Sequence, residues 1–142
     1  MTLSPKSRIL AIDFGDARTG LAATDWTGTI TVPLPRIDSR DPAEVVRQIV
    51  ELAAERDSQA MVVGMPLCVD GSAGDRAQRT GRFVELLRAA TKLPVETVDE
   101  SHSTDEAHER LKQGGIKAKR RKDFADSVAA LVILERFRQQ LR

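Results

Sequence analysis

Residues 9–25, ILAIDFGDARTGLAATD, carry most of the information about the fold. The run from residue 8 to residue 14 is nearly continuous in apolar character, which is typical of a central strand buried on both faces. Gly15 then predicts a turn, and residues 19–25 predict a second strand. Asp13 breaks the pattern, because it places a carboxylate at the end of a core strand, where an uncompensated charge is costly.

The rest of the chain predicts a mixed sheet. Residues 29–32 complete an antiparallel meander with the first two strands. The pattern then alternates helices and strands, with expected helices at 40–57, 75–91, 104–113 and about 123–141 and expected strands at 60–65 and 93–100. This order indicates a single α/β domain over residues 1–142, with helices on both faces of the sheet. We expect residues 1–7 to be flexible and residues 114–121 to form a flexible basic loop.

Composition restricts the class of protein. The chain has 142 residues, a net charge of +1 and one cysteine, so an intramolecular disulfide is excluded. The N-terminus lacks the apolar segment of a signal peptide, and the apolar runs are too short to span a bilayer. We therefore expect a cytoplasmic protein with no membrane partner.

A local basic run stands out against the near-neutral total. Residues 117–122, KAKRRK, place five cationic side chains in six positions. Such a run either binds phosphate groups or forms a solvated loop, and its composition alone does not decide between the two. Its cationic members are Lys117, Lys119, Arg120, Arg121 and Lys122.

Acidic residues occur at three places that apolar patterning does not explain. Asp126 precedes apolar residues at helical spacing, so it heads the helix face that packs on the sheet. Asp13 shares its strand face with apolar residues. Asp99 and Glu100 end a later strand, and alternation leaves open which of them joins Asp13, because strand ends often twist or bulge. Each acid alone is also explained by capping or by pairing with an arginine.

Together these acids predict a metal site. Convergent carboxylates repel one another unless a cation lies among them, and hard oxygen ligands with open coordination positions suit Mg²⁺ or Mn²⁺. Such ions, bound partly by substrate phosphate, activate water and stabilise the leaving oxygen in phosphodiester hydrolysis.

Four motifs resemble the YqgF/RuvX family, whose RNase H-like members are described as Holliday junction resolvases and as pre-16S rRNA nucleases. The similarity keeps the order of the motifs and runs from about residue 8 to residue 137. The motifs are DFGDARTGLAATD at 13–25, VVGMPLCVDGSAGDRAQRTGRF at 62–83, VETVDESHSTDEA at 95–107 and KDFADSVAALVIL at 122–134.

The resemblance implies an RNase H-like fold and a metal-dependent nuclease. Asp13, Glu100 and Asp126 match the family's catalytic, metal-binding acids, so the family pattern selects Glu100 and leaves Asp99 as a supporting candidate. Arg18 matches the signature arginine and is expected to contact substrate phosphate or to pair with an acid.

Two positions depart from the family pattern. Ser101 replaces the arginine that usually follows the paired acids, which removes a cation beside the site. His102 follows as a substitute donor or proton carrier, or as an exposed loop histidine. Cys68 replaces a polar residue and is interpreted as a small, half-buried hydrophobe. Asp25, which closes the first motif, is expected to be structural.

The implied partner is nucleic acid, either precursor rRNA or branched DNA, and the basic run is assigned to its phosphates. Few aromatic side chains are available, which favours recognition of backbone and shape over bases. Two other functions stay open: a non-catalytic RNA-binding ribosome assembly factor, favoured by Ser101, and a fragment of an actin-like ATPase, whose phosphate turn is similar. A homodimer would favour junction DNA, because a resolvase needs two sites that act together.

Overall fold

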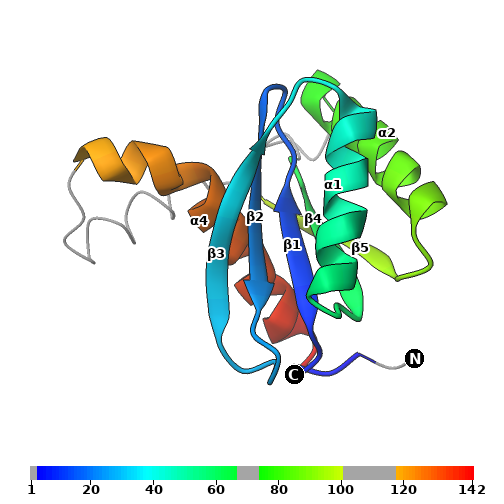
Figure 1. Ribbon diagram of the computed structural model, residues 1–142, viewed down its shortest axis with the longest axis vertical. Coiled ribbons are helices and arrows are strands. Elements are labelled where there is room, and N and C mark those ends of the chain that lie inside the picture. The colour runs from blue at the N-terminus through cyan, green and yellow to red at the C-terminus, as the bar shows by residue number, and fades with distance from the viewer. Residues whose placement is uncertain (1–2, 67–73, 101–117) are drawn as a thin grey trace.

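The computed structural model describes residues 3–66, 74–100 and 118–142, and of residues 118–126 the backbone alone. Five strands form one mixed sheet in the order β3-β2-β1-β4-β5 (Figure 1). The first three strands are antiparallel, whereas β1, β4 and β5 run parallel. This arrangement confirms the predicted mixed sheet. The bounds are β1 Ile9–Asp13, β2 Arg18–Thr24, β3 Thr31–Asp38, β4 Ala60–Met65 and β5 Val95–Asp99.

Three helices connect to or cover this sheet in the described part of the chain. They are α1 Pro42–Glu55, α2 Asp75–Ala90 and α4 Ala118–Gln140. At the start of α1, the Asp41 carboxylate accepts a hydrogen bond of 3.0 Å from the Ala43 amide, and Pro42 takes the first helical position. Both choices are favoured at a helix N-terminus, which explains why α1 begins there. The helix predicted at 104–113 lies outside the described residues.

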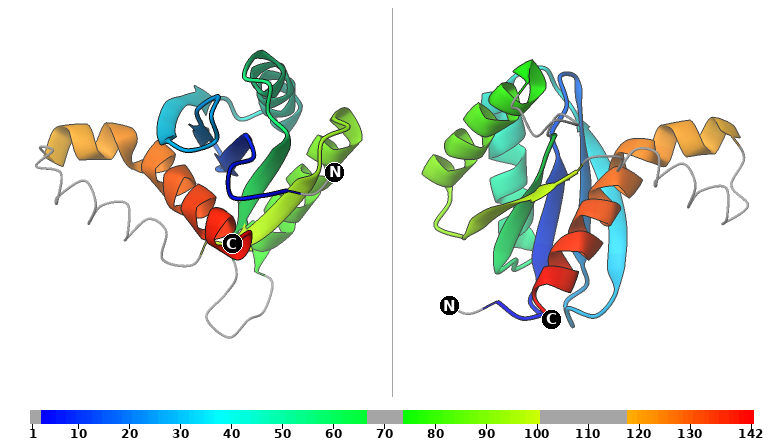
Figure 2. Two further views of the ribbon diagram at one scale, coloured as in Figure 1. Left: turned by 90° about the horizontal axis from the view of Figure 1, so that it is seen from below. Right: turned by 180° about the vertical axis from the view of Figure 1, so that it is seen from behind.

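The helices divide the core into two layers. Figure 2 shows α4 crossing one face of the sheet, with α1 and α2 on the other. Residues at alternate positions of β1 follow this division: Leu10 and Ile12 pack toward α1 and α2, whereas Ile9 and Ala11 pack toward α4. The central strand is thus buried on both faces, as its continuous apolar sequence predicts.

The third strand differs from its prediction. It was expected at 29–32, whereas β3 runs from Thr31 to Asp38 and includes Pro33 and Pro35. Proline lacks an amide donor and is tolerated on edge strands, and β3 is an edge of the sheet. The prolines therefore interrupt the sequence pattern typical of a strand without preventing the pairing of β3 with β2.

The last helix begins earlier than predicted. Residues 118–121 were assigned to a loop and the helix to about residue 123, but α4 already begins at Ala118. Alanine, lysine and arginine are good helix formers, and no glycine or proline interrupts them. The first turns of α4 extend beyond the sheet past β3 (Figure 1). None of the helices in the described ranges has both the length and the apolar character of a membrane span.

The start of the chain is tied to the end of α4. Residues expected to be flexible form a turn in which the Ser7 amide donates to the Ser4 carbonyl oxygen at 3.0 Å. The Arg138 guanidinium donates to the carbonyl oxygen of Pro5 at 3.1 Å and of Gly28 at 3.0 Å. These contacts join the chain start, the β2–β3 turn and α4.

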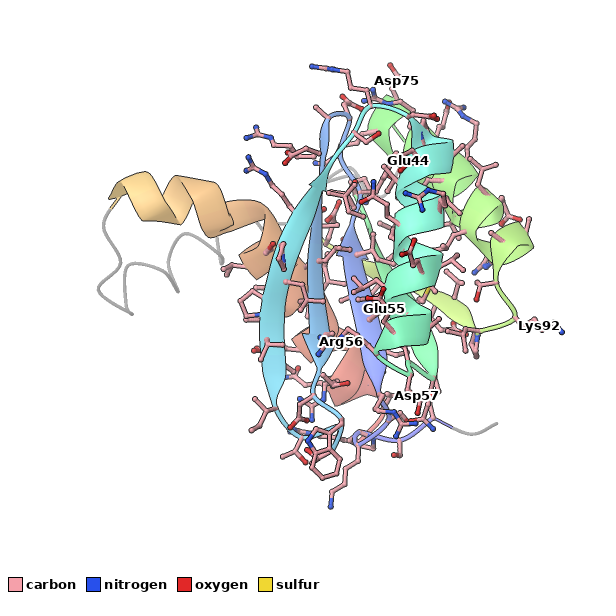
Figure 3. The ribbon with its side chains drawn as sticks, in the orientation of Figure 1. Glu44, Glu55, Arg56, Asp57, Asp75 and Lys92 are labelled. Atoms are coloured by element: carbon pink, nitrogen blue, oxygen red, sulfur yellow. The ribbon has the colours of Figure 1, made fainter. Side chains whose placement is uncertain are left out.

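The topology brings several element ends to one edge. Since β1, β4 and β5 are parallel, their carboxyl ends point the same way. Figure 3 places Asp75, the first residue of α2, at the same end of the molecule as Glu44 in the first turn of α1, whereas Arg56 and Asp57 mark the opposite end. Loops at the carboxyl edge of such sheets are the usual location of functional sites.

Candidate functional site

Two acidic side chains meet at the carboxyl edge, on the α4 side of the sheet. Asp13 ends β1 and is 8% exposed, and Glu100 directly follows β5 and is 7% exposed. Acidic side chains are almost never this buried unless they are paired or bind a cation. Their burial therefore makes this edge the candidate functional site.

Strand alternation identifies which of the two neighbouring acids faces Asp13. Val98 packs in the core beneath α4, and Glu100, two residues later, lies on the same face. Asp99 is exposed, and its carbonyl oxygen accepts a hydrogen bond of 2.9 Å from Arg136. The amide of Glu100 donates to the Met65 carbonyl oxygen at 3.2 Å, which continues the ladder between β4 and β5.

Gly64 in β4 provides the space in which the two carboxyl groups meet. Since β4 lies between β1 and β5, the Glu100 side chain must cross it to reach Asp13. A Cβ atom placed on Gly64 would lie 2.8 Å from Glu100 Oε2 and 3.0 Å from Glu100 Cβ, and it would also collide with Ile133. Any larger residue would therefore displace Glu100 or α4.

The environment of Glu100 favours the neutral form of its carboxyl group. Burial, followed by the hydrogen bond with Asp13 and the charge of Asp13, raises the pKa of Glu100 to about 9. The charge of Asp99 adds to the rise, whereas that of Arg76 opposes it. One proton per pair at neutral pH is the expected behaviour of adjacent buried carboxyl groups.

Arg76 lies over this pair, and the sequence reasoning did not single it out. Its Nη2 atom is 3.8 Å from Asp13 Oδ1 and 3.6 Å from Glu100 Oε1, and its side chain is 57% exposed. Arg76 is the second residue of α2, the helix that follows β4. A cation in the first turn of a helix that follows a parallel strand lies at the carboxyl edge of the sheet. This position in the sequence could have identified Arg76 as a candidate site residue.

The donor set suits a hard divalent cation. The two carboxylates offer oxygen ligands, and a magnesium-type ion bound by one or two carboxylates keeps its remaining positions for water and phosphate. Among the residues whose side chains are described, no cluster of three or more His, Cys, Asp or Glu residues could hold a metal. Asp126, the expected third acid, has its backbone in α4 and its side chain outside the described part.

The α4 stripe that Asp126 heads is confirmed. Ala130, Ile133, Leu134 and Phe137 are buried against the same sheet face as Asp13. Asp126 precedes Ala130 by four residues, about one turn. The place of Asp126 on this helix face and its role as a third metal ligand both stay predictions, because its side chain lies outside the described part.

The remaining predicted residues have different positions. Arg18 begins β2 and is exposed, and antiparallel pairing places it at the same edge as the end of β1. The Asp25 carboxylate accepts hydrogen bonds from Thr27 Oγ1 at 2.8 Å and from the amides of Thr29 and Ile30 at 3.1 Å. Asp25 thus organises the β2–β3 turn, at the end of the sheet away from the acids.

The basic run and the departures from the family pattern are described only in part. Lys119, Arg120, Arg121 and Lys122 belong to the first turns of α4, and their side chains lie outside the described part. The four residues Cys68, Ser101, His102 and Lys117 also lie outside the described residues. Phosphate binding by the basic run stays a prediction.

Comparison with known proteins places this geometry in context. A family model described as RuvX, Holliday junction resolvase, matches residues 7–140. A protein named "Putative pre-16S rRNA nuclease" from Synechococcus sp. strain JA-2-3B'a(2-13) is 38% identical over 133 residues, which cover 94% of this chain and 78% of that protein. A protein of the same name from Chloroflexus aggregans is 38% identical over 127 residues, or 89% of each chain.

Solved structures share the fold. The chain superposes on Thermus thermophilus RuvC bound to a Holliday junction substrate with a TM-score of 0.62, at 17% identity and 94% coverage of both chains. The fowlpox virus resolvase in complex with Holliday junction DNA gives a TM-score of 0.55 at 10% identity, over 94% of this chain and 98% of that one. At these identities the likeness establishes the RNase H-like fold alone.

Proposed function

We propose, on the premise that this chain belongs to the RuvX family of Holliday junction resolvases and is a nuclease, that Asp13, Glu100 and Asp126 form its divalent-metal site. The site would serve hydrolysis of phosphodiester bonds in structured nucleic acid. The observation that carries the proposal is the buried Asp13–Glu100 pair at the carboxyl edge, assembled across Gly64.

The acids have separate tasks in this proposal. A bound divalent ion supplies Lewis acidity to the attacking water and to the leaving oxygen. As a ligand of that ion, Glu100 would have to be ionised, so cation binding would be coupled to release of its proton. Asp126 would approach from α4, the helix that packs on the face to which Asp13 belongs. Mg²⁺ and Mn²⁺ are the proposed ions, because both accept carboxylate, water and phosphate oxygens.

The arginines at the edge are assigned to the substrate. Arg76 is more than half exposed and within 4 Å of both carboxyl groups, so it can contact a phosphate held beside the acids. Arg18 lies at the same edge and is assigned to a neighbouring phosphate. Guanidinium groups suit this task because they bind phosphate oxygens through two parallel hydrogen bonds.

The proposed substrates are precursor 16S rRNA and branched DNA. The relatives at 38% identity bear the name of a pre-16S rRNA nuclease, and the family model bears that of a junction resolvase. Both substrates present phosphate backbones that depart from a regular duplex. A role on junction DNA would be accompanied by a homodimer, since two strands must be cut together, and light scattering with and without junction DNA measures this directly.

The function is tested by cleavage. Purified protein is incubated with precursor rRNA, junction DNA and single strands, with Mg²⁺, Mn²⁺ or chelator. We expect metal-dependent cleavage that falls to background in Asp13→Asn and Asp126→Asn. Asp57→Asn serves as the matched control, because Asp57 is an exposed acid that pairs with Arg8 at the opposite end of the molecule. Cleavage by both acid variants at the parent rate would reveal a contaminating nuclease and overturn the proposal.

A binding role without catalysis gives the opposite pattern. Tight binding to precursor rRNA, together with acid variants that still restore rRNA processing in cells lacking the protein, would identify an assembly factor. In that case the buried acids would have no part in the cellular function.

A further inference from the structure

A pocket opens at the carboxyl edge of the sheet, on the face opposite to that of Asp13 and Glu100. It has a volume of about 350 Å³ and is lined by residues from the β1–β2 turn, the start of α1 and the middle of α2. Phe14, which directly follows Asp13, packs toward the α1 and α2 layer and forms part of its wall. The volume is at the small end of the range for ligand pockets.

One wall of this pocket is apolar. The rings of Phe14 and Phe83 are stacked, with centroids 4.1 Å apart and planes within 8° of parallel. Phe83 is buried, whereas Leu86 is 48% exposed and is one of few large apolar side chains with that exposure in the described part. The pocket therefore presents to its occupant the ring of Phe14, which is held by its stacking on the buried Phe83, and the accessible aliphatic side chain of Leu86.

Three arginines surround the apolar wall. Arg79 pairs with Asp16 at 2.7 Å, and Arg40 and Arg82 complete the rim. Within the described ranges, the side chains of Arg40 and Arg82 make no hydrogen bond or ion pair, and both residues are exposed. Three cations and one carboxylate give the rim a positive balance, so charge complementarity selects an anionic occupant.

A row of arginines connects the pocket to the acids. Arg76, Arg79 and Arg82 are spaced three residues apart on α2, so they lie along one side of the helix. Arg76 lies over Asp13 and Glu100, whereas Arg82 reaches the pocket. The six residue steps from Arg76 to Arg82 rise about 9 Å, which corresponds to about two or three nucleotides of a stacked strand.

We propose that this pocket holds one unpaired nucleotide of the substrate, close to the bond that is cut. Its base lies against Phe14 and Leu86, and its phosphate lies between Arg40 and Arg82. An unpaired nucleotide combines a flat apolar face with an anionic group, which matches the wall and the rim. Stacking of this kind tolerates any base, so the pocket selects unpaired strand and not sequence. The proposal rests on the nuclease function.

The test measures binding by an inactive protein. Asp13→Asn is combined with Arg40→Gln, Arg82→Gln or, as a charge-matched control, Lys92→Gln. Lys92 follows α2 at the end of that helix away from Asp75 (Figure 3). Fluorescence anisotropy with Mg²⁺ records affinity, at several salt concentrations, for an RNA hairpin with a single-stranded flank and for its DNA counterpart. One abasic nucleotide is then moved along the flank.

We expect Arg82→Gln and Arg40→Gln to weaken binding several-fold and to lower the salt slope of log affinity by about 0.7 each, the value for one lost contact to single-stranded phosphate. Lys92→Gln should bind like the parent. One abasic position, at a fixed distance from the cut made by the active enzyme, should weaken binding about fivefold or more.

Two results would contradict the proposed nucleotide pocket without contradicting the nuclease function. One is equal affinity and salt slope for the arginine variants and Lys92→Gln, and the other is an equal effect of every abasic position. The nuclease function is judged separately, by cleavage in the parent and its loss in Asp13→Asn. Since Arg40, Arg82 and Lys92 are all exposed, thermal unfolding should show that each variant retains the parent fold.

Discussion

Glu100 and Asp13 share a hydrogen bond although their strands are not neighbours. β4 lies between β1 and β5, and two strand spacings amount to about 10 Å. The Glu100 and Asp13 side chains together span this gap above Gly64, where no side chain intervenes. The pair therefore depends on a residue that offers no ligand of its own.

Gly64→Ala tests this dependence. The added methyl group would collide with Glu100 and Ile133, so we expect loss of cleavage together with a destabilisation of about 1–3 kcal/mol, as for other overpacked cores. Chemical denaturation and cleavage assays measure the two effects.

Gly81→Ala is the control for that substitution. A Cβ atom on Gly81 meets nothing within 4 Å, and the residue lies inside α2. Alanine favours a helix interior over glycine by about 1 kcal/mol, so this variant should gain stability and keep its activity. Full activity in Gly64→Ala would show that the crossing is not needed.

The fold could be predicted from the sequence because the apolar patterns of β1, β4, α1 and α4 are strong and agree with one another. The pattern of β3 was weak, since Pro33 and Pro35 interrupt it, and only its position at the sheet edge explains their presence. The bounds of β3 therefore depend on its place in the sheet and not on its local sequence pattern.

The site could be predicted only in part. Strand alternation left Asp99 and Glu100 as alternatives, because strand ends often twist or bulge, and the family pattern alone selected Glu100. Arg76 could not be identified from apolar pattern or composition, because its role depends on where α2 begins in space. The gap at Gly64 likewise follows from strand order, which local pattern does not specify.

The stability of the metal-free protein should fall as the pH rises. The pKa of Glu100 is raised from its ordinary value of 4.5 to about 9, so the folded protein keeps a proton that the unfolded chain has already released. The contribution of Glu100 to the free energy of unfolding is then largest below about pH 4.5, and it is lost as the pH rises through about 9. Denaturation in chelator at several pH values measures the slope, and Glu100→Gln should flatten it. An unchanged slope in that variant would contradict the assignment.

Divalent cations should stabilise the folded protein. Binding at one hundred times the dissociation constant adds about 2.7 kcal/mol, which corresponds to a rise in melting temperature of several degrees for a chain of this size. Scanning calorimetry with Mg²⁺ or Mn²⁺ should show this rise in the parent and in Asp57→Asn. Asp13→Asn should show none, and an equal rise in that variant would place the cation elsewhere.

Arg76→Ala should separate substrate binding from metal binding. If Arg76 holds phosphate beside the acids, its loss removes a charged hydrogen bond worth about 1.5–3 kcal/mol, so kcat/KM should fall about 10-fold to 100-fold. Lys92→Ala should leave it unchanged. Arg76 also opposes the rise in the pKa of Glu100, so that pKa, followed by carboxyl-carbon NMR in metal-free protein, should move higher in the variant. A variant with unchanged kcat/KM but a raised Glu100 pKa would confine Arg76 to positioning the acids.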